Sequence, residues 1–179
     1  MREQGFTHNL MQGDSKVRYF ELTMWPHVRA AYNFARWLVR NNQDAEDIVQ
    51  ESFLKAYNAL DGFRGGDSRV WMLAIVRNTS MNFLRKRKPE SVEELTREPR
   101  DPAPNPESGV MERARRKEVR SAIAQLAPEF REPLILRELE ELSYKEIAAV
   151  LQIPMGTVMS RLSRARNLLL AELNREVAK

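Results

Sequence analysis

The stretch SYKEIAAVLQIPMGTVMSRLSRAR, residues 143–166, decides the fold because it predicts two short amphipathic helices joined by a turn. In the second helix and its continuation, Val158, Leu162, Ala165 and Leu169 recur at intervals of three and four residues. With an advance of ~100° per residue, these four side chains fall on one face of the helix. We therefore expect this face to be buried against the rest of the protein.

The turn contains Gln152 and Ile153, and Pro154 then fixes the backbone at the first position of the second helix. The other side of that helix is polar and basic. This pattern is typical of a helix-turn-helix whose second helix enters the major groove of DNA. The residues on the polar side are Met159, Ser160, Ser163 and Arg164, with Arg161 and Arg166 at its two edges.

The chemistry of these side chains suits DNA. Arg164 is the residue best placed for a bidentate contact with guanine, and the two serines can bond bases or phosphates. Arg161 and Arg166 point toward the DNA backbones, where they would add salt-dependent affinity. An ordinary amphipathic surface helix is the alternative, but such helices usually mix charges, and residues 151–171 contain no Asp or Glu.

The composition of the 179-residue chain excludes several other functions. There is no cysteine, which excludes disulfides, thiolate metal sites and cysteine nucleophiles and fits a reducing cytoplasm. Only two histidines occur, His8 and His27, so a metal centre is poorly supported and no catalytic set of nucleophile and base is visible. No apolar run approaches the ~18 residues of a membrane span, and the N-terminus has no signal core. We expect a cytoplasmic protein that is not inserted in a membrane, is not an enzyme, and uses no cofactor, metal or small-molecule substrate.

Charge and proline divide the chain. Residues 1–88 hold 14 Lys/Arg against 9 Asp/Glu, residues 89–112 hold 2 against 7, and residues 113–179 hold 13 against 9. Five of the nine prolines fall in the acidic segment, which predicts an extended linker. The expected organisation is a flexible lead-in (1–17), a first domain (18–88), the linker (89–112) and a second domain (113–179).

Both domains read as helical, so the predicted fold class is all-α, with two small helical domains. The apolar spacing is helical throughout and almost no alternating strand pattern occurs. Pro26 lies near an irregular start of the first helix, and Asn42 or Asp44 is the expected cap of the second. The predicted helices are 19–40, 44–60, 68–87, 113–126, 129–140, 143–151 and 154–176.

Long motifs in each half resemble one known family. LAPEFREPLILRELEELSYKEIAAVLQIPMGTVMSRLSRAR is similar to domain four of the extracytoplasmic-function sigma factors of bacterial RNA polymerase. DAEDIVQESFLKAYNALDGFRG, followed by WMLAIVRNTSMNFLRKRK, is similar to their domain two. The resemblance covers residues 19–88 and 113–175, and the order and spacing also match. The chain departs from the family at Gln152, where glycine is frequent, and at Met159, where a more polar residue is frequent.

The resemblance implies an alternative sigma factor, which binds core RNA polymerase and directs transcription initiation at promoters. It further implies transcription regulation by a separate anti-sigma factor. Domain four would read the minus-thirty-five element of promoter DNA, and domain two would read the minus-ten element and help to open it. The residues expected at the minus-thirty-five element are Thr157, Met159, Ser160, Arg161, Ser163, Arg164 and Arg166.

The predicted helix over 44–60 has an acidic face. Asp44, Asp47 and Glu51 share that face with Gln50 beside them, while Ile48 and its apolar neighbours offer anchors. A solvated acidic stripe would give the same pattern. The resemblance implies that this helix docks on the clamp helices of the largest polymerase subunit, where charge complementarity sets specificity and rate. The expected contacts are Asp44, Asp47, Ile48, Gln50 and Glu51.

The predicted helix over 68–87 has two unlike sides. Leu73 and Val76 belong to the apolar side, whereas Asn78 and Asn82 lie on a side that suits nucleic acid. Trp71 shares the second side and is compatible with either the core or DNA. The glycine-bearing loop 61–68 resembles the family's loop that captures a flipped base, although a plain connector would look similar. The residues expected at the minus-ten element are Phe63, Arg64, Asn78, Thr79, Asn82 and Arg85.

A free-standing helix-turn-helix transcriptional regulator is the alternative function. In that case the N-terminal half would be a sensor or a dimerisation module. The absence of a βα alternation and the presence of the domain-two motif both count against it.

Overall fold

A computed structural model describes residues 3–86 and 110–177 of the chain, and every regular element within these ranges is a helix. None of these helices combines the length and the apolar composition that a membrane span needs. The order of the elements is α1 (Glu3–Met24), η1 (Trp25–His27), α2 (Val28–Val39), α3 (Asn42–Ala59), η2 (Leu60–Gly62), α4 (Ser68–Lys86), α5 (Val110–Gln125), α6 (Pro128–Glu138), α7 (Tyr144–Leu151) and α8 (Met155–Val177).

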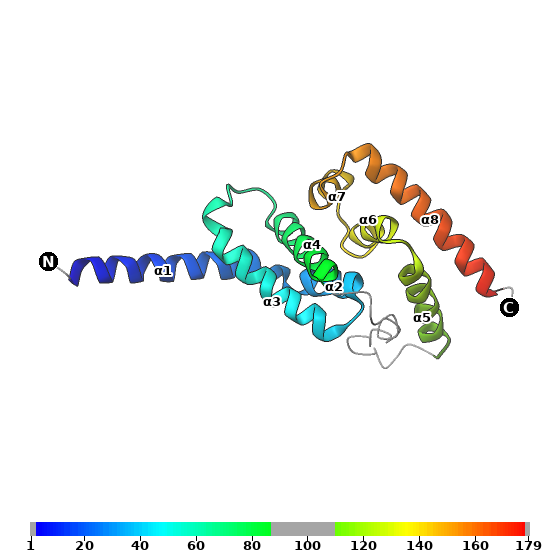
Figure 1. Cartoon of the computed structure of the whole chain (residues 1–179), viewed down its shortest axis with the longest axis horizontal. Coiled ribbons are helices and arrows are strands. Elements are labelled where there is room, and N and C mark those ends of the chain that lie inside the picture. Colours follow the sequence, from blue (N-terminus) through cyan, green and yellow to red (C-terminus); the bar gives the residue numbers. More distant parts are fainter. Residues whose placement is uncertain (1–2, 87–109, 178–179) are drawn as a thin grey trace.

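The N-terminal bundle consists of α1 to α4. Helices α2, α3 and α4 pack against one another around a core of large apolar side chains that are almost completely buried. Helix α1 joins this core only at its C-terminal end, and its N-terminal end runs away from the bundle (Figure 1). There the Phe20 ring packs edge-on against the rings of Phe53 and Tyr57, with centroids 6.0 and 5.4 Å away. The core includes Met24, Phe34, Ile48, Met72, Leu73 and Val76.

The first helix differs from its prediction. Residues 3–17, expected to be a flexible lead-in, belong to α1, which contains no proline to interrupt it. The predicted helix over 19–40 is divided at Pro26, where the chain forms the short 3₁₀ helix η1. Proline cannot donate the backbone hydrogen bond that a continuous helix needs at this position.

The other boundaries lie close to those expected. The cap of α3 is Asn41, whose Oδ1 accepts from the backbone N–H groups of Gln43 and Asp44. Asn42 and Asp44, the two predicted caps, are already helical. The first backbone N–H groups of α4 are similarly satisfied by Asp67. Both caps use a short polar side chain to satisfy donors that have no partner within the helix.

The C-terminal bundle consists of α5 to α8 and contains the helix-turn-helix. Ser143 and Glu146 form a reciprocal capping box at the start of α7. The helix ends at Gln152, which has left-handed backbone angles (φ 55°, ψ 43°), as its place in the turn predicts. Val158 and Leu162 of α8 are buried against α6 and α7, and α5 packs along α8.

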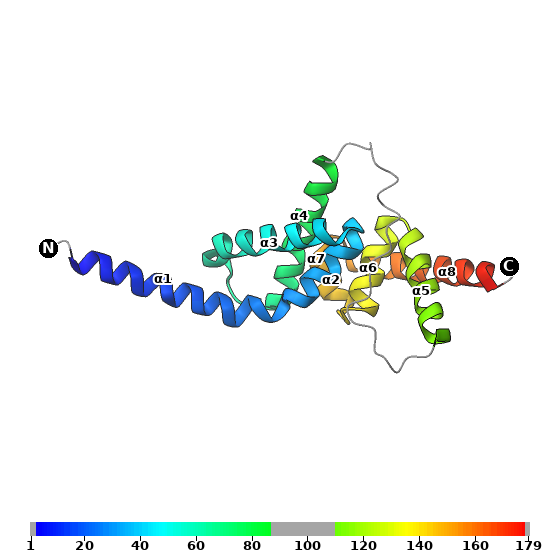
Figure 2. The ribbon, with the colours of Figure 1, turned by 90° about the horizontal axis from the view of Figure 1, so that it is seen from below.

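The two bundles lie against each other, with α4 packed on α7 and α2 packed on α6 (Figures 1 and 2). Helices α1 and α8 extend toward opposite ends of the long axis (Figure 1). The all-α fold class with two helical bundles is confirmed. Most of the predicted linker, 89–112, lies outside the described residues, and residues 110–112 belong to α5.

Candidate nucleic-acid interface

Helix α8 is amphipathic in the way its sequence predicts. Val158, Leu162 and Ala165 are fully buried, which anchors one side of the helix in the bundle. On the other side Met159 is 51% exposed, and its neighbours are also exposed to solvent. The exposed set contains Ser160, Ser163, Arg164 and Arg166, while Thr157 and Arg161 are half-buried. The structure thus brings all seven predicted residues to one end of α8, on its outward side and its edges.

Two of the arginines are held in place by α6. Arg166 Nη2 donates to Glu138 Oε1 at 2.8 Å, and hydrogen bonds to Glu138 and Tyr144 raise the pKa of Arg166. The guanidinium of Arg164 lies 5.9 Å from the centroid of the Phe130 ring. Cation–π contact of this kind restrains the side chain without using its N–H donors. Arg164 therefore keeps its planar fork for an external acceptor, as guanine recognition requires.

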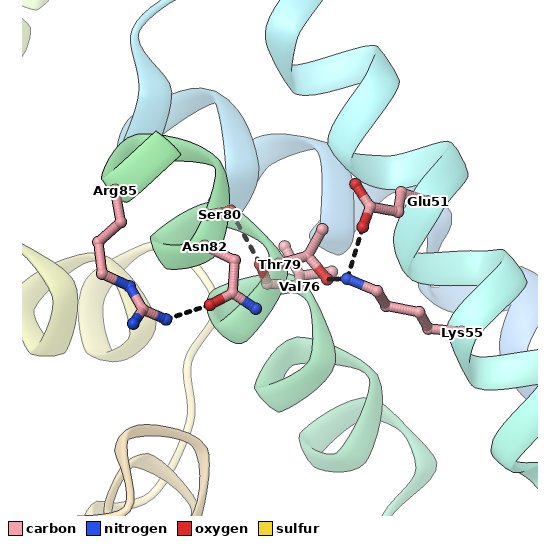
Figure 3. A network of polar contacts seen from close by, with 7 residues as sticks. All are labelled: Glu51, Lys55, Val76, Thr79, Ser80, Asn82 and Arg85. Atoms are coloured by element: carbon pink, nitrogen blue, oxygen red, sulfur yellow. Dashed lines mark hydrogen bonds and ion pairs between the residues drawn. The ribbon is translucent and has the colours of Figure 1, made fainter. Parts of the chain in front are cut away.

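Helix α4 presents a narrower polar strip. Asn78, Asn82 and Arg85 are exposed, and Arg85 Nη2 donates a hydrogen bond to the side-chain oxygen of Asn82 (Figure 3). Thr79, which we predicted to contact DNA, is only 2% exposed. That prediction is wrong, because one step of ~100° from Asn78 turns Thr79 toward α3. Its hydroxyl accepts from Lys55 Nζ at 3.2 Å.

Lys55 joins α4 to α3. Its ammonium lies 2.6 Å from Glu51 Oε1 and also reaches Thr79, so it bridges two helices (Figure 3). Ser80, also buried in α4, donates to the carbonyl of Val76 instead of reaching across to α3. Glu51, on the acidic face of α3, is therefore linked through one cation to the helix that carries Asn78.

The loop before α4 is shaped by two glycines. Gly65 (φ 87°) and Gly66 (φ 101°) take backbone angles that other residues rarely adopt. They follow Phe63, whose half-buried ring stacks at a tilt on Trp71 with centroids 4.9 Å apart, and Arg64, which is exposed. Trp71 is thus neither in the core nor free on the surface. Phe63 and Trp71 line one wall of a groove of about 700 Å³ whose other wall is α7.

The exposed side of α3 carries acidic and amide groups. Asp47, Gln50 and Glu51 are exposed, and Asp44 is half-buried in the first turn. Ile48, predicted as a polymerase contact, is 1% exposed and belongs to the core. The prediction fails for Ile48 because its direction on the helix faces α2 and α4, where it is needed for packing.

One exposed apolar residue on α3 was missed. Leu54 is 66% exposed and follows Gln50 and Glu51 by four and three residues, so it shares their face. Its spacing from Asp47, seven residues, was the signal in the sequence that could have found it. The exposed face of α3 therefore contains one large apolar side chain, Leu54, among acidic and amide groups.

Both halves of the chain match known protein families. Residues 26–90 match Sigma-70 region 2, and residues 116–169 match Sigma-70, region 4. The chain is 35% identical over 177 residues to the ECF RNA polymerase sigma-E factor of Salmonella typhimurium, covering 93% of this chain and 91% of that protein. It is 33% identical over 178 residues to the RNA polymerase sigma-H factor of Pseudomonas aeruginosa, covering 92% and 90%.

Solved structures show the same likeness. The sigma factor RpoE, in complex with the anti-sigma factor NepR from Bartonella quintana, matches with a TM-score of 0.73 and 29% identity over 88% of this chain and 98% of that one. CnrH in complex with the cytosolic domain of CnrY matches with a TM-score of 0.65 and 27% identity, covering 88% and 89%.

Two helical bundles with a helix-turn-helix in the second define a sigma-type transcription factor. The chain belongs to the extracytoplasmic-function family of RNA polymerase sigma factors. The match of residues 26–90 to region 2 removes the alternative of a free-standing regulator whose N-terminal half is a sensor.

Proposed function

We propose that this chain joins core RNA polymerase in the cytoplasm as its promoter-reading subunit and leaves all chemistry to the polymerase. The observation that carries the proposal is that two faces of opposite character are exposed on one small protein. The acidic face of α3 suits a basic protein surface, and the basic face of α8 suits DNA.

Docking uses α3. Asp47 and Glu51 would meet basic groups on the clamp helices of the largest subunit, and Gln50 would hydrogen-bond beside them. Leu54 would lose most of its exposed surface in the complex, which supplies the apolar contact that charge alone does not. Partial desolvation strengthens the charge pairs at such a contact and fixes its register.

Upstream recognition uses α8. Arg164 would donate both N–H groups of its fork to a guanine in the minus-thirty-five element, with Ser160 and Ser163 beside it. Arg161 and Arg166 would hold the phosphates and set the position of the helix along the groove. Met159, exposed at the centre of this side, favours an apolar contact such as a thymine methyl group.

Minus-ten recognition uses α4 and the loop before it. Asn78 and Asn82 can each donate and accept toward base edges, and Arg85 lies at the end of the same strip. Phe63 or Arg64 would stack on a flipped base, which returns roughly 1–3 kcal/mol. Unstacking costs a few kcal/mol per step, so the loop cannot open the duplex without the polymerase.

Regulation by a separate anti-sigma factor is part of the proposal. A protein of this family with a similar fold was solved in complex with the anti-sigma factor NepR. A partner that covers the exposed faces of α3 or α8 would block polymerase or DNA directly.

The test is assembly with a bacterial core polymerase. Purified chain is mixed with core and separated by gel filtration, alongside the variant Asp47→Arg/Glu51→Arg. Glu118→Arg/Glu129→Arg is the matched control, because both residues are exposed in the C-terminal bundle and the charge change is equal. We expect the wild type and the control to co-migrate with core and the α3 variant to elute alone.

Run-off transcription then tests the activity. Wild-type chain with core should start transcripts at discrete sites on a genomic DNA library, and core alone should not. A folded chain that ignores core yet shifts duplex DNA alone would refute the proposal.

A further inference from the structure

Two ion pairs join α4 to the C-terminal bundle. Arg77 Nε lies 2.6 Å from Glu132 Oε2 of α6, and Arg69 Nη2 lies 2.5 Å from Glu140 Oε2, just beyond the end of α6. Both cations come from one helix of the N-terminal bundle, and both anions come from the other bundle. The pairs therefore exist only while the bundles are closed on each other.

The carboxylates of these pairs are buried. The side chains of Glu132 and Glu140 are 6% and 5% exposed, whereas those of Arg77 and Arg69 are 22% and 33% exposed. Burying such a pair costs much of what the attraction between the charges gains, because both ions lose water. When the bundles separate, all four groups regain their water. The pairs thus orient the bundles, and removing only the two carboxylates would leave Arg69 and Arg77 without partners in the contact, which disfavours closure.

The same contact also contains a repulsion. Arg131 of α6 is buried beside Arg40 at the end of α2, and desolvation followed by the charge of Arg40 lowers the pKa of Arg131 to about 10. Glu132 opposes this shift. Like charges on α2 and α6 oppose their contact, which makes closure of the bundles less favourable.

The paired arginines border the surface that reads the minus-ten element. Arg77 immediately precedes Asn78, and Arg69 immediately follows the glycine-bearing loop 61–68, which contains Asp67, the cap of α4. A strand running from the loop to Asn78 would pass both arginines, which lie about 12 Å apart along the helix axis. In the closed chain α7 stands in that path, because Lys145 and Glu146 form the wall of the groove opposite Phe63.

We propose that Arg69 and Arg77 form a phosphate-binding edge of α4, which the closed chain fills with its own Glu140 and Glu132 until the C-terminal bundle moves away. Carboxylate and phosphate offer the guanidinium fork the same acceptors, so one replaces the other. This inference rests on the proposed function, because the phosphates are those of the minus-ten strand. It adds two DNA contacts and makes the free chain a weak binder of single-stranded DNA.

The first experiment measures binding of fluorescein-labelled oligodeoxythymidylate by anisotropy at low salt, with no polymerase present. Glu132→Gln/Glu140→Gln keeps the shape of both side chains and removes their charge. We expect it to bind at least about tenfold more tightly than the wild type, because the open fraction rises. Glu129→Gln/Glu141→Gln is the control, since both residues are exposed and the change in net charge is the same.

A second set of variants tests the arginines themselves. Adding Arg69→Gln/Arg77→Gln to the opened variant should return the affinity to the wild-type level or below. It should also lower the slope of log K against log salt by about 1.4, because two phosphate contacts are lost from a single strand. Circular dichroism melting establishes that each variant is folded.

Opening is followed by fluorescence energy transfer. The chain has no cysteine, so Asn58→Cys on α3 and Asn167→Cys on α8, both exposed, give two clean labelling sites. Transfer should fall in Glu132→Gln/Glu140→Gln and stay constant in the control. Equal DNA affinity in the opened variant and the control overturns the proposal, whether or not transfer falls. Loss of polymerase assembly by the wild type would instead count against the proposed function, since no step here uses polymerase.

Discussion

Helices α3 and α8 each expose one long side, and the two sides have opposite charge. On α3 the exposed groups are Asp47, Gln50 and Glu51 around Leu54, and on α8 they are arginines and serines around Met159. Each side has a residue in an ion pair: Glu51 pairs with Lys55 within α3, and Arg166 of α8 pairs with Glu138 of α6. The net charge of +4 for the whole chain therefore hides an acidic side on α3 and a basic side on α8.

The difference teaches that the two faces should respond to salt in different ways. Contacts with DNA release condensed counterions, so affinity at α8 should fall steeply and linearly on a log–log scale. Contacts at α3 combine a few charges with apolar burial around Leu54, so salt should mainly slow their association.

On α8, Arg164→Ala should reduce selectivity for the upstream promoter element by about 1–3 kcal/mol, roughly 5- to 150-fold, because the bidentate contact with guanine is lost. Run-off transcription on promoters with intact and scrambled upstream elements measures this ratio. Arg175→Ala is the control, as Arg175 is exposed near the far end of α8. Unchanged selectivity in Arg164→Ala would show that another residue reads the base.

On α3, Leu54→Ala should weaken binding to core polymerase by about 1–2 kcal/mol, roughly 5- to 30-fold, because a buried leucine at the centre of the contact is truncated. Titration of labelled chain with core measures the Kd. Stability should not change, since Leu54 is exposed in the free chain. Leu170→Ala, which removes an exposed leucine of α8, should bind core normally. Equal affinity for both variants would place the contact elsewhere on α3.

Gln152, in the turn before α8, has a left-handed backbone conformation, whereas the residues that flank α3 have negative φ angles. Gln152→Gly should stabilise the chain by up to about 1 kcal/mol, because glycine adopts φ 55° without a steric penalty. The urea midpoint measures the gain. Asn167→Gly, in the exposed middle of α8, should instead destabilise by about 0.5 kcal/mol. A loss of stability in both variants would contradict the strain at Gln152.

Mild acid should affect only the half of the molecule that contains α3, since both histidines precede residue 28. Burial lowers the pKa of His27 and Arg69 adds to this, while Asp67 opposes it. The unfolded chain therefore binds the proton first, and stability should fall slightly as the pH drops below 6.5. Melting from pH 7.5 to 5.5 should show a shallower slope in His27→Gln. Parallel slopes would mean that His27 does not contribute.

The sequence was sufficient to predict which face of α8 is buried. The apolar spacing of α8 predicted its buried face, since Val158, Leu162 and Ala165 are all buried and α8 packs on α5, α6 and α7. It was less reliable for single residues of α3 and α4. There Ile48 and Thr79, which we predicted as contacts, face neighbouring helices, and Leu54, which we did not predict, faces solvent.

The contact between the bundles could not be predicted at all. Arg77 and Glu132 are 55 residues apart, and Arg69 and Glu140 are 71 apart. No periodicity relates residues at such distances, and each charge alone resembles an ordinary surface group. Pro26 is the opposite case, because it interrupts the helix through its own missing N–H group and needs no distant partner to do so.

The ion pairs across the bundles have a consequence for exchanging parts between related proteins. A chimera that joins this N-terminal bundle to a foreign C-terminal bundle would place unmatched residues opposite Arg69 and Arg77. Such a hybrid would keep α4 and α8 intact. Its equilibrium between closed and separated bundles would nevertheless change, because the two ion pairs could not form. We therefore expect an exchanged C-terminal bundle to preserve this equilibrium only when it carries glutamate at the positions of Glu132 and Glu140, opposite Arg77 and Arg69.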